Sequence, residues 1–310
     1  MKIFRSWHAV PAPFRHGAIT VGNFDGVHLG HEQIIAETRG HALAVNGPAL
    51  AVTFEPHPRA ILFPHEAPRR LCHLHERLER LNQCGLDAVL LLHFDHNLAA
   101  WSAESFVRRL HETLAFRHIH AGYDFAFGHG RSGDASLLRR IGGQLGFTVS
   151  IAEAFELEGA VVSSSRIRSA IEAADFKLVE RLLGRPYSIS GHVGRGDARG
   201  RKLGFPTANL NVRDLAHPPA GVYAVIAETR RQRWHGAAYF GYRPTFQGRT
   251  LILETHVFDD NPNLYKQRLK VTFVERVRED RAFPNPEALA RQIEKDCAAA
   301  RAILAQRDNT

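Results

Sequence analysis

The chain has 310 residues, 44% of them hydrophobic, which fits two globular domains rather than a disordered or fibrous protein. It has no run of about eighteen apolar residues and no apolar secretory segment at its start, so we expect a cytoplasmic protein without a membrane partner. Three scattered cysteines exclude a disulfide framework and a CxxC zinc site. The formal net charge of +8 indicates an anionic partner but does not identify it.

Residues 1–184 alternate apolar, β-rich runs with helical patterns. This alternation predicts an α/β domain with a Rossmann-like parallel sheet covered on both faces, whose ligands bind at the carboxyl ends of the strands. The predicted strands are Ala18–Val21, Leu50–Phe54, Ala88–Leu92, Ile119–Gly122 and Phe147–Ile151, and the predicted helices are Leu29–Val45, His75–Cys84, Ala103–Leu114 and Ser136–Leu145.

Two short helices, Ser164–Ala173 and Phe176–Leu183, are predicted to close this domain. Residues 185–310 then show turn-separated β patterns, which predict a small antiparallel β-barrel. An amphipathic helix at Pro286–Ala305 is expected to plug or flank the barrel. The predicted barrel strands are Tyr187–Val193, Gly221–Glu228, His235–Tyr239, Leu251–Phe258 and Leu269–Val277.

The first strand, turn and helix carry the pattern His28-Leu-Gly-His31. Positions three apart share a helix face, and a helix start presents free N–H groups to a phosphate, so both imidazoles can flank one phosphorus atom. Imidazole donors aimed at a phosphoryl group in transit stabilise its developing charge without a covalent intermediate. The alternative is a helix start with two incidental histidines.

A second motif, Ser163-Ser-Ser-Arg166-Ile-Arg168, directly precedes a predicted helix. Its hydroxyls can cap that helix, and its two arginines can attract phosphate oxygens. Alone it describes only a capped basic helix. Together with the histidine pattern, it is similar to the adenylyltransferase branch of the nucleotidyltransferase superfamily, in which the two motifs converge on a nucleoside triphosphate.

Two aromatic segments follow strand ends, Phe54-Glu-Pro56-His57 and Asp124-Phe125-Ala-Phe127. A flat ring system can stack on such side chains, and ordinary core packing is the alternative. The glycine pattern at Gly128–Gly133 resembles a dinucleotide fingerprint but does not directly follow a strand, so we set a nicotinamide site aside.

His118 and His120 alternate along a predicted strand and therefore share one face, as two metal ligands would. No third ligand is apparent from the sequence. A metal site is accordingly the minor interpretation of this pair.

The segment from Gly191 to Leu210 is the most unusual stretch of the second half, because several glycines and cationic side chains lie on one predicted loop. Its backbone amides can wrap phosphates, while oxygens of Thr207 and Asn209 can reach a hard cation such as magnesium. The chain has no Walker Gly-Lys-Ser/Thr triplet. The alternative interpretation is an arginine-glycine hairpin that contacts RNA.

The whole chain resembles the bacterial bifunctional riboflavin kinase and FMN adenylyltransferase (FAD synthetase) family. The resemblance rests on GNFDGVHLGH and SSSRIR in the first half and on GRKLGFPTANL in the second. It implies that residues 1–184 are the adenylyltransferase domain and residues 185–310 the riboflavin kinase domain. It also implies two consecutive reactions, in which ATP phosphorylates riboflavin to FMN and a second ATP adenylylates FMN to FAD and pyrophosphate.

The resemblance further implies residue roles. His28 and His31 would stabilise the α-phosphate, Glu254 would be the general base of the kinase reaction, and Mg²⁺ would lie at Thr207 and Asn209. The implied ATP and phosphate contacts are Gly22, Asn23, Phe24, Asp25, Ser164, Arg166, Arg168, Gly196, Gly200, Arg201, Gly204 and Thr207. The implied flavin contacts are Asp124, Phe125, Phe127, Phe54, Pro56 and His57.

The implied partners are riboflavin, FMN and ATP, with Mg²⁺ as cofactor, no tightly bound prosthetic group and no nucleic acid. We expect a monomer or a weak homo-oligomer. One departure is notable, because Tyr239-Phe-Gly-Tyr242 replaces the family's usual Asn-Ile-Gly-Thr-like run. Two rival functions are a single-activity nucleotidyltransferase with a binding barrel and a nucleic-acid-binding protein, whose affinity would fall steeply with salt.

Overall fold

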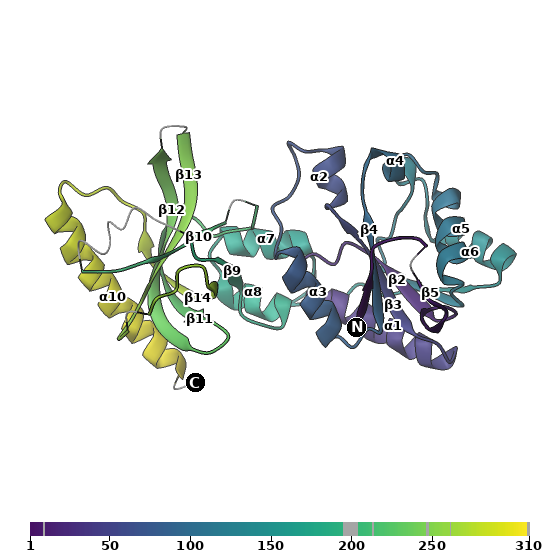
Figure 1. The fold of residues 1–310 in the computed structure, drawn as a ribbon, viewed down its shortest axis with the longest axis horizontal. Coiled ribbons are helices and arrows are strands. Elements are labelled where there is room, and N and C mark those ends of the chain that lie inside the picture. Colours follow the sequence, from purple (N-terminus) through teal and green to yellow (C-terminus); the bar gives the residue numbers. More distant parts are fainter. Residues whose placement is uncertain (9, 195–203, 213, 246–247, 261, 309–310) are drawn as a thin grey trace. The chain divides into compact units, whose positions relative to one another are not determined.

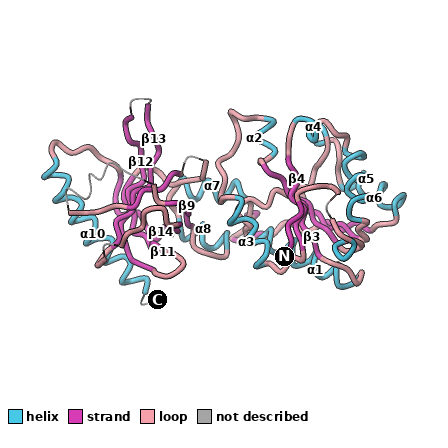
Figure 2. The backbone as a smooth tube through the Cα atoms, viewed as in Figure 1, coloured by secondary structure: helices cyan, strands magenta, loops and turns pink. Residues whose placement is uncertain are grey.

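The computed structural model describes residues 1–8, 10–194, 204–212, 214–245, 248–260 and 262–308. The chain divides into two compact units, Met1–Ser164 and Ser165–Thr310, named below the parallel-sheet unit and the barrel unit. Each unit has its own group of strands with helices around it (Figure 2). Among the described residues, no helix is both long enough and apolar enough to cross a membrane.

The parallel-sheet unit is built on six strands in the spatial order β1-β4-β3-β2-β5-β6, and all of their pairings are parallel. The inner strands are almost entirely buried, which suits the mainly apolar sequences of β2, β3 and β4, while β5 buries two histidines. The predicted parallel sheet is confirmed, and only β1 lacks a predicted counterpart, because three residues carry no periodicity. The strands are β1 (Lys2–Phe4), β2 (Ala18–Val21), β3 (Ala49–Glu55), β4 (Ala88–His93), β5 (His118–Ala121) and β6 (Thr148–Ile151).

Helices cover both faces of this sheet (Figure 1). The pair α5 (Ala103–Leu114) and α6 (Ala135–Leu145) packs on one face, and the pair α1 (Leu29–Ala44) and α3 (Leu74–Gln83) packs on the other. Their ends differ from the predicted ends by at most one residue. Gly146 ends α6 with φ of +81°, in the left-handed region where glycine is favoured.

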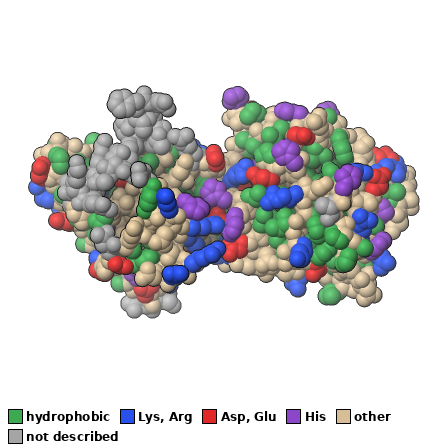
Figure 3. All heavy atoms as spheres, in the orientation of Figure 1, with side chains coloured by type: hydrophobic (Ala, Val, Ile, Leu, Met, Phe, Trp, Pro, Cys, Tyr) green, Lys and Arg blue, Asp and Glu red, His purple; other side chains and the backbone are tan. Residues whose placement is uncertain are grey.

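Shorter elements complete the parallel-sheet unit. They are η1 (Ala12–Phe14), α2 (Pro58–Leu62), α4 (His96–Ala99), η2 (His129–Arg131) and the hairpin of β7 (Glu156–Leu157) with β8 (Ala160–Val161). On the face of this unit that Figure 3 shows, basic and acidic side chains are interspersed. The net positive charge of the chain is therefore not gathered into one patch there.

The barrel unit contains six strands in the order β10-β13-β12-β11-β14-β9, and all of these pairings are antiparallel. The N–H of Gly194 donates to the carbonyl of Asn209 at 2.9 Å, which joins the two ends of the sheet and nearly closes the barrel. The predicted barrel is confirmed. The strands are β9 (Ser188–His192), β10 (Ala208–Asn211), β11 (Gly221–Glu228), β12 (Arg233–Thr245), β13 (Gly248–Val257) and β14 (Arg268–Glu279).

The glycine- and arginine-rich segment from Gly191 to Leu210 is not a loop at its two ends. Gly191 and His192 belong to β9, within the predicted strand Tyr187–Val193, whereas Ala208-Asn-Leu-Asn211 forms β10, which was not predicted. In β10, buried Ala208 and Leu210 alternate with polar asparagines, which is a strand pattern. The many glycines and arginines upstream had favoured a loop throughout.

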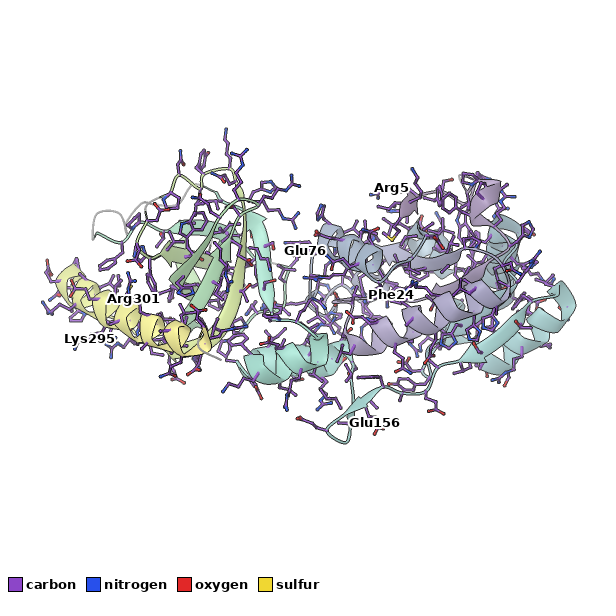
Figure 4. All side chains as sticks on the ribbon, turned by 90° about the horizontal axis from the view of Figure 1, so that it is seen from below. Arg5, Phe24, Glu76, Glu156, Lys295 and Arg301 are labelled. Atoms are coloured by element: carbon purple, nitrogen blue, oxygen red, sulfur yellow. The ribbon has the colours of Figure 1, made fainter. Side chains whose placement is uncertain are left out.

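The terminal helix α10 (Pro286–Asp308) flanks the barrel and packs on β11, β12 and β14. A buried ion pair fixes it, since the Arg278 guanidinium donates to the Asp296 carboxylate at 2.8–3.0 Å. Figure 4 labels Lys295 and Arg301 on this helix, and Arg301 pairs with Asp259 at 2.6 Å on the exposed side. Of the two predicted positions for the helix, flanking is the correct one.

Two helices, α7 (Ser164–Glu172) and α8 (Phe176–Leu183), precede the barrel strands. The Phe176 ring stacks on Phe273 of β14 with 5.4 Å between the centroids, so α8 packs against the barrel. Gly184 ends α8 in the left-handed conformation, as the sequence predicts. A functional boundary between residues 184 and 185 stays a prediction.

Candidate active sites

The turn between β2 and α1 brings two imidazoles together. His28 is the N-cap of α1, His31 lies three residues further on, and their rings stack with 3.7 Å between the centroids. The backbone N–H of His31 donates to Nδ1 of His28 at 3.4 Å, so a neutral His28 ring carries its proton on Nε2. The start of α1 therefore combines imidazole donors with the N–H groups of a helix terminus, which suits a phosphate.

Close packing fixes the orientation of these rings. Phe24, labelled in Figure 4, is buried and packs edge-on against His31 with 5.2 Å between the centroids. At Gly30, a Cβ atom would lie 3.3 Å from Nδ1 of His28 and 3.4 Å from the carbonyl oxygen of Val162. Only a glycine lets the first turn of α1 approach both groups without crowding.

The predicted phosphate-binding turn, residues 22–25, is held by hydrogen bonds to its neighbours. The N–H of Gly22 donates to the carbonyl of Val52 at 3.0 Å. The buried carboxylate of Asp25 accepts the N–H of Leu71 at 2.9 Å, so this side chain anchors the turn. The turn is therefore attached to β3 on one side and to the segment before α3 on the other.

Arg77 on α3 was not among the predicted site residues, yet it supports the turn directly. Its buried guanidinium donates to the carbonyl oxygens of Asn23 at 3.0 Å and Phe54 at 2.9 Å, and to the Glu55 carboxylate at 2.8 Å. One side chain thus connects the histidine turn to the carboxyl end of β3. The sequence carried a signal, because this arginine interrupts the apolar stripe of an amphipathic helix.

The serine-arginine motif begins at the same turn. The Ser164 hydroxyl donates to the carbonyl of Asp25 at 3.0 Å, which places the first residue of α7 against the residues that precede His28. Arg166 and Arg168 follow on α7 in the barrel unit. Their approach to the imidazole pair stays a prediction.

The first predicted flavin segment lies at the carboxyl end of β3, the edge where parallel sheets bind ligands. The Phe54 ring packs edge-on against Phe94 with 5.7 Å between the centroids. Pro56 follows a cis peptide bond, and the His57 side chain caps α2 by accepting the N–H of Arg59 at 3.2 Å. The flavin-binding role of this segment stays a prediction.

The second predicted flavin segment follows β5. The Phe125 ring stacks on Phe127 with 5.0 Å between the centroids, and Phe127 is buried in the core beside Phe106. Asp124 is exposed. Phe127 therefore packs in the core, and a flavin contact by Asp124, Phe125 or Phe127 stays a prediction.

In the barrel unit, three polar residues lie directly opposite one another on neighbouring strands. Asn209 of β10 pairs with Glu254 of β13, and Glu254 pairs with Tyr239 of β12. Residues paired in this way have Cβ atoms about 4.5–5.5 Å apart, so the three side chains are neighbours on one face. Leu253 and Thr255 are buried on the other face. Glu254 is thus a half-buried carboxylate between an amide and a phenol.

Tyr239 was not among the predicted site residues. Burial, together with the negative charges of Asp280 and Glu254, raises its pKa to about 12, and its hydroxyl is hydrogen-bonded to Asp280. A Cβ atom at Gly241 would collide with that hydroxyl, so the glycine leaves room for the ring. The sequence carried one signal, because residues Tyr239–Tyr242 differ from the run that is usual in the family. That difference marked Tyr239 as unusual but did not show which side chains lie beside it.

The segment that precedes β10 is pinned to β13. His256 donates from Nδ1 to the carbonyl of Pro206 at 2.9 Å, because a carbonyl can only accept. The Asn209 amide donates to the carbonyl of Thr207 at 3.4 Å. These contacts hold Thr207 next to β10, whose Asn209 pairs with Glu254. The predicted phosphate contacts Gly196, Gly200 and Arg201 lie outside the described residues.

Two family profiles match the chain in sequence order. The FAD synthetase profile matches residues 11–166, and the riboflavin kinase profile matches residues 183–304. The imidazole pair falls within the first match, and Glu254 falls within the second. The kinase match over the barrel favours two activities over a single nucleotidyltransferase with a binding barrel.

Similar proteins cover nearly the whole chain. The bifunctional riboflavin kinase/FMN adenylyltransferase of Pseudomonas fluorescens is 42% identical over 307 residues, which are 98% of each chain. The protein of the same name from Escherichia coli K12 is 37% identical over 304 residues, which are 97% of each chain. A crystal structure described as a macrolide-efflux protein from Streptococcus pneumoniae matches with a TM-score of 0.82 at 29% identity, over 95% of this chain and 96% of that one.

The predicted family and its two activities are confirmed by these matches. The enzyme phosphorylates riboflavin with ATP to give FMN, and it adenylylates FMN with ATP to give FAD and pyrophosphate. With both profiles matched in order and identity maintained over nearly its full length, the chain belongs to the bifunctional riboflavin kinase/FMN adenylyltransferase family.

Proposed function

We propose that residues 1–184 adenylylate FMN and that residues 185–310 phosphorylate riboflavin. His28 and His31 of the parallel-sheet unit act in the first reaction, and Glu254 of the barrel acts in the second. The observation that carries this division is the placement of two dissimilar sets of groups. A stacked imidazole pair lies at a helix N-terminus in one unit, and a carboxylate lies between Asn209 and Tyr239 in the other.

In the adenylylation step, a phosphate oxygen of FMN attacks the α-phosphorus of ATP, and the bond to the β-phosphate breaks to release pyrophosphate. Negative charge builds on the α-phosphoryl oxygens during this exchange. His28 offers its Nε2–H as a donor, because its Nδ1 accepts the N–H of His31. His31 lies against it and contributes the second imidazole. Each well-placed donor of this kind is worth about 3–4 kcal/mol in the transition state.

In the kinase step, the terminal ribityl hydroxyl of riboflavin attacks the γ-phosphorus of ATP, and ADP leaves. Glu254 accepts the proton of that hydroxyl, a contribution of about 10²–10⁴-fold in rate. The carboxylate suits this role because the pairing of β13 with β10 and β12 fixes its position. Arg166, Arg168 and Ser164 are assigned instead to the adenylylation reaction, where they contact the triphosphate of its ATP.

Magnesium fits the donor set of the barrel unit. The Thr207 hydroxyl, the Asn209 amide oxygen and the Glu254 carboxylate are all oxygen donors, which a small hard cation prefers. The Asn209 amide nitrogen donates to the carbonyl of Thr207, which leaves the amide oxygen as the acceptor for a cation. Thr207 and Asn209 would hold the ion, which when bound neutralises charge on the ATP phosphates. The proposed enzyme acts in the cytoplasm as a monomer or weak homo-oligomer, without nucleic acid.

A crossed assay tests the division between the units. His28→Ala and Glu254→Gln are each supplied with riboflavin or with FMN, together with ATP and magnesium chloride, and the flavins are separated by chromatography. We expect His28→Ala to form FMN normally but to make FAD about 10²–10³-fold more slowly. We expect Glu254→Gln to lose FMN formation by about 10²–10⁴-fold while it still adenylylates supplied FMN.

His75→Ala is the matched control, because it removes an exposed imidazole of α3 from the same unit as His28. Both activities of this control should equal those of the unmodified enzyme. Equal loss of both reactions in His28→Ala would contradict separate sites. Continued kinase turnover in Glu254→Gln would remove that carboxylate as the general base.

A further inference from the structure

The parallel-sheet unit holds a second group of histidines that neither reaction uses. His41 lies near the end of α1, and His118 and His120 lie on β5, so the third imidazole that the sequence did not reveal comes from a helix. One ring nitrogen from each of the three lies within 4.8 Å of the other two. The rings of His41 and His118 stack with 3.9 Å between their centroids.

Both ring nitrogens of His118 have a hydroxyl neighbour. Nδ1 lies 2.7 Å from the Thr148 hydroxyl oxygen, and Nε2 lies 2.7 Å from the Ser150 hydroxyl oxygen. A hydroxyl can either donate to an imidazole nitrogen or accept from it, so Nε2 of His118 can present its lone pair to an ion.

A carboxylate neighbour fixes the tautomer of His120. Its Nε2 lies 2.7 Å from the Glu37 carboxylate, whose other oxygen accepts a hydrogen bond from Gln33 at 2.7 Å. The N–H is not ideally aligned with the carboxylate. A bare nitrogen lone pair so close to a carboxylate would nevertheless be repelled, so the proton is on Nε2. Nδ1 of His120 then faces the Ser150 hydroxyl oxygen at 2.6 Å.

The Ser150 hydroxyl on the edge strand β6 lies between the three imidazoles. Its oxygen is 2.7 Å from Nε2 of His118, 2.6 Å from Nδ1 of His120 and 3.1 Å from Nε2 of His41. Three imidazole nitrogens, two of them on buried side chains, therefore converge on one point, as they do around a metal ion.

We propose that His41, His118 and His120 bind a divalent transition metal of the zinc class, with the Ser150 hydroxyl or a water molecule as the fourth ligand. Imidazole nitrogens suit zinc, copper or nickel, whereas magnesium prefers oxygen, so this site differs from that of the ATP-bound cation. Zinc–nitrogen bonds of about 2.0–2.1 Å require ligand nitrogens about 3.3 Å apart in a tetrahedron. The nitrogens now lie within 4.8 Å of one another, so the side chains must move closer when an ion binds.

The carboxylate beside His120 completes the pattern of a metal site. A metal-bound imidazole commonly donates its other N–H to a carboxylate, which orients the ring and makes it a stronger ligand. Glu37 lies in that position, is itself oriented by Gln33, and has a side chain 39% exposed, so an ion can enter from its side. Glu37 is thus a positioning residue rather than a ligand.

The proposed site lies far from the imidazole pair at the start of α1. Thirteen residues separate His28 from His41, which along a helix is about 20 Å. A metal at His41 would tie the end of α1 to β5, and through Ser150 to β6. We therefore expect it to stabilise the parallel-sheet unit rather than to take part in either reaction.

The test uses the full chain without an affinity tag, stripped with a chelator and then given zinc chloride alone. Bound zinc is measured by elemental analysis after dialysis, and affinity by titration calorimetry. We expect one zinc ion per chain, an affinity at least 100-fold weaker in His41→Gln, and an affinity 10–100-fold weaker in Glu37→Gln. His75→Gln, which removes an exposed imidazole on α3, should bind zinc as the unmodified chain does.

Cobalt(II) chloride supplies a second readout that does not depend on a variant. Four-coordinate cobalt with three imidazoles gives strong visible absorption, whereas six-coordinate surface binding gives a weak band. Strong absorption that disappears in His41→Gln supports the site, provided that this variant retains both flavin-forming activities as a sign of folding. A weak band in the unmodified chain, or equal zinc content in His41→Gln and His75→Gln, would overturn the proposal.

Discussion

The two candidate active sites are built in different ways. The imidazole pair comes from one continuous segment, a strand, turn and helix start, and His28 and His31 face each other because they are three residues apart on α1. The site around Glu254 instead combines three strands, whose members at 209, 239 and 254 meet only through pairing register. A site on a helix terminus depends on local geometry, whereas a site on a sheet depends on the whole barrel.

Both units also contain a buried arginine-carboxylate pair, but the two pairs have different neighbours. Arg77 with Glu55 supports the turn that leads to His28. Arg278 with Asp296 attaches α10 to β14. Disrupting each pair in turn therefore tests whether that pair supports an active site or only the fold of its unit.

Arg77→Ala should have the largest effect. Removing one partner of a buried ion pair costs about 3–5 kcal/mol, since the Glu55 carboxylate and two carbonyl oxygens lose their donor. We expect the denaturant transition that accompanies loss of adenylylation to shift to lower denaturant by that amount. In the remaining folded enzyme, adenylylation should also slow, because the turn is no longer held at Asn23.

Arg70→Ala is the matched control, because Arg70 also pairs with Glu55, at 2.7 Å, but is partly exposed. Exposed pairs contribute about 0–1 kcal/mol, so this variant should unfold almost as the unmodified enzyme does. If Arg70→Ala and Arg77→Ala lost similar amounts of stability and of adenylylation activity, the contacts of Arg77 with the turn would not matter. The kinase activity serves as an internal reference for both variants.

Asp296→Asn should have the next largest effect, on stability alone. The Asp296 side chain is 5% exposed and that of Arg278 is 18% exposed, so we expect a loss of about 2–3 kcal/mol, less than for the more deeply buried Arg77. The unfolding transition of the kinase activity should shift, and adenylylation should not change. Asp259→Asn, which disrupts an exposed pair with Arg301 of the same helix, should leave the unfolding transition nearly unchanged.

The contrast between the sites also explains what the sequence could predict. The parallel sheet, its helices and the position of His28 and His31 follow from patterns within short segments, so they could be placed nearly to the residue. β10 was hidden because its four residues follow a glycine-rich run. Two other juxtapositions could not be predicted. Tyr239 lies beside Glu254 because of the strand-pairing register, and His41 lies beside His118 because α1 packs on the sheet. Both depend on contacts between distant segments, which the pattern of a single sequence does not reveal.

His256→Ala tests how far the barrel site depends on its anchoring bond. The Nδ1 donor holds the carbonyl of Pro206, and so the adjacent Thr207, against β13. Loss of one such hydrogen bond costs about 1–1.5 kcal/mol, so we expect kinase kcat/KM for ATP to fall about tenfold, with adenylylation unchanged. His235→Ala, which removes a half-buried histidine of β12, should keep full kinase activity, and a tenfold loss there would indicate a general effect on the barrel.

Tyr239→Phe should have the smallest effect, and it tests the cross-strand arrangement most directly. Because the pKa of Tyr239 is about 12, its hydroxyl stays protonated throughout the neutral range and donates to Asp280 rather than carrying charge beside Glu254. Removing it leaves Asp280 without that donor, and we expect kinase kcat to fall about threefold, or roughly 0.7 kcal/mol.

The pH dependence sharpens this last prediction. An unfolded tyrosine ionises near pH 10 and the folded one only near 12, so folding binds the proton more tightly and Tyr239 lowers the stability of the fold only above about pH 10. The kinase pH profile below that value should keep its shape in Tyr239→Phe. Tyr242→Phe, an exposed residue of the same strand, should match the unmodified enzyme. A shifted profile in Tyr239→Phe would mean that Tyr239 exchanges a proton in the reaction, and Glu254 would then no longer be its only base.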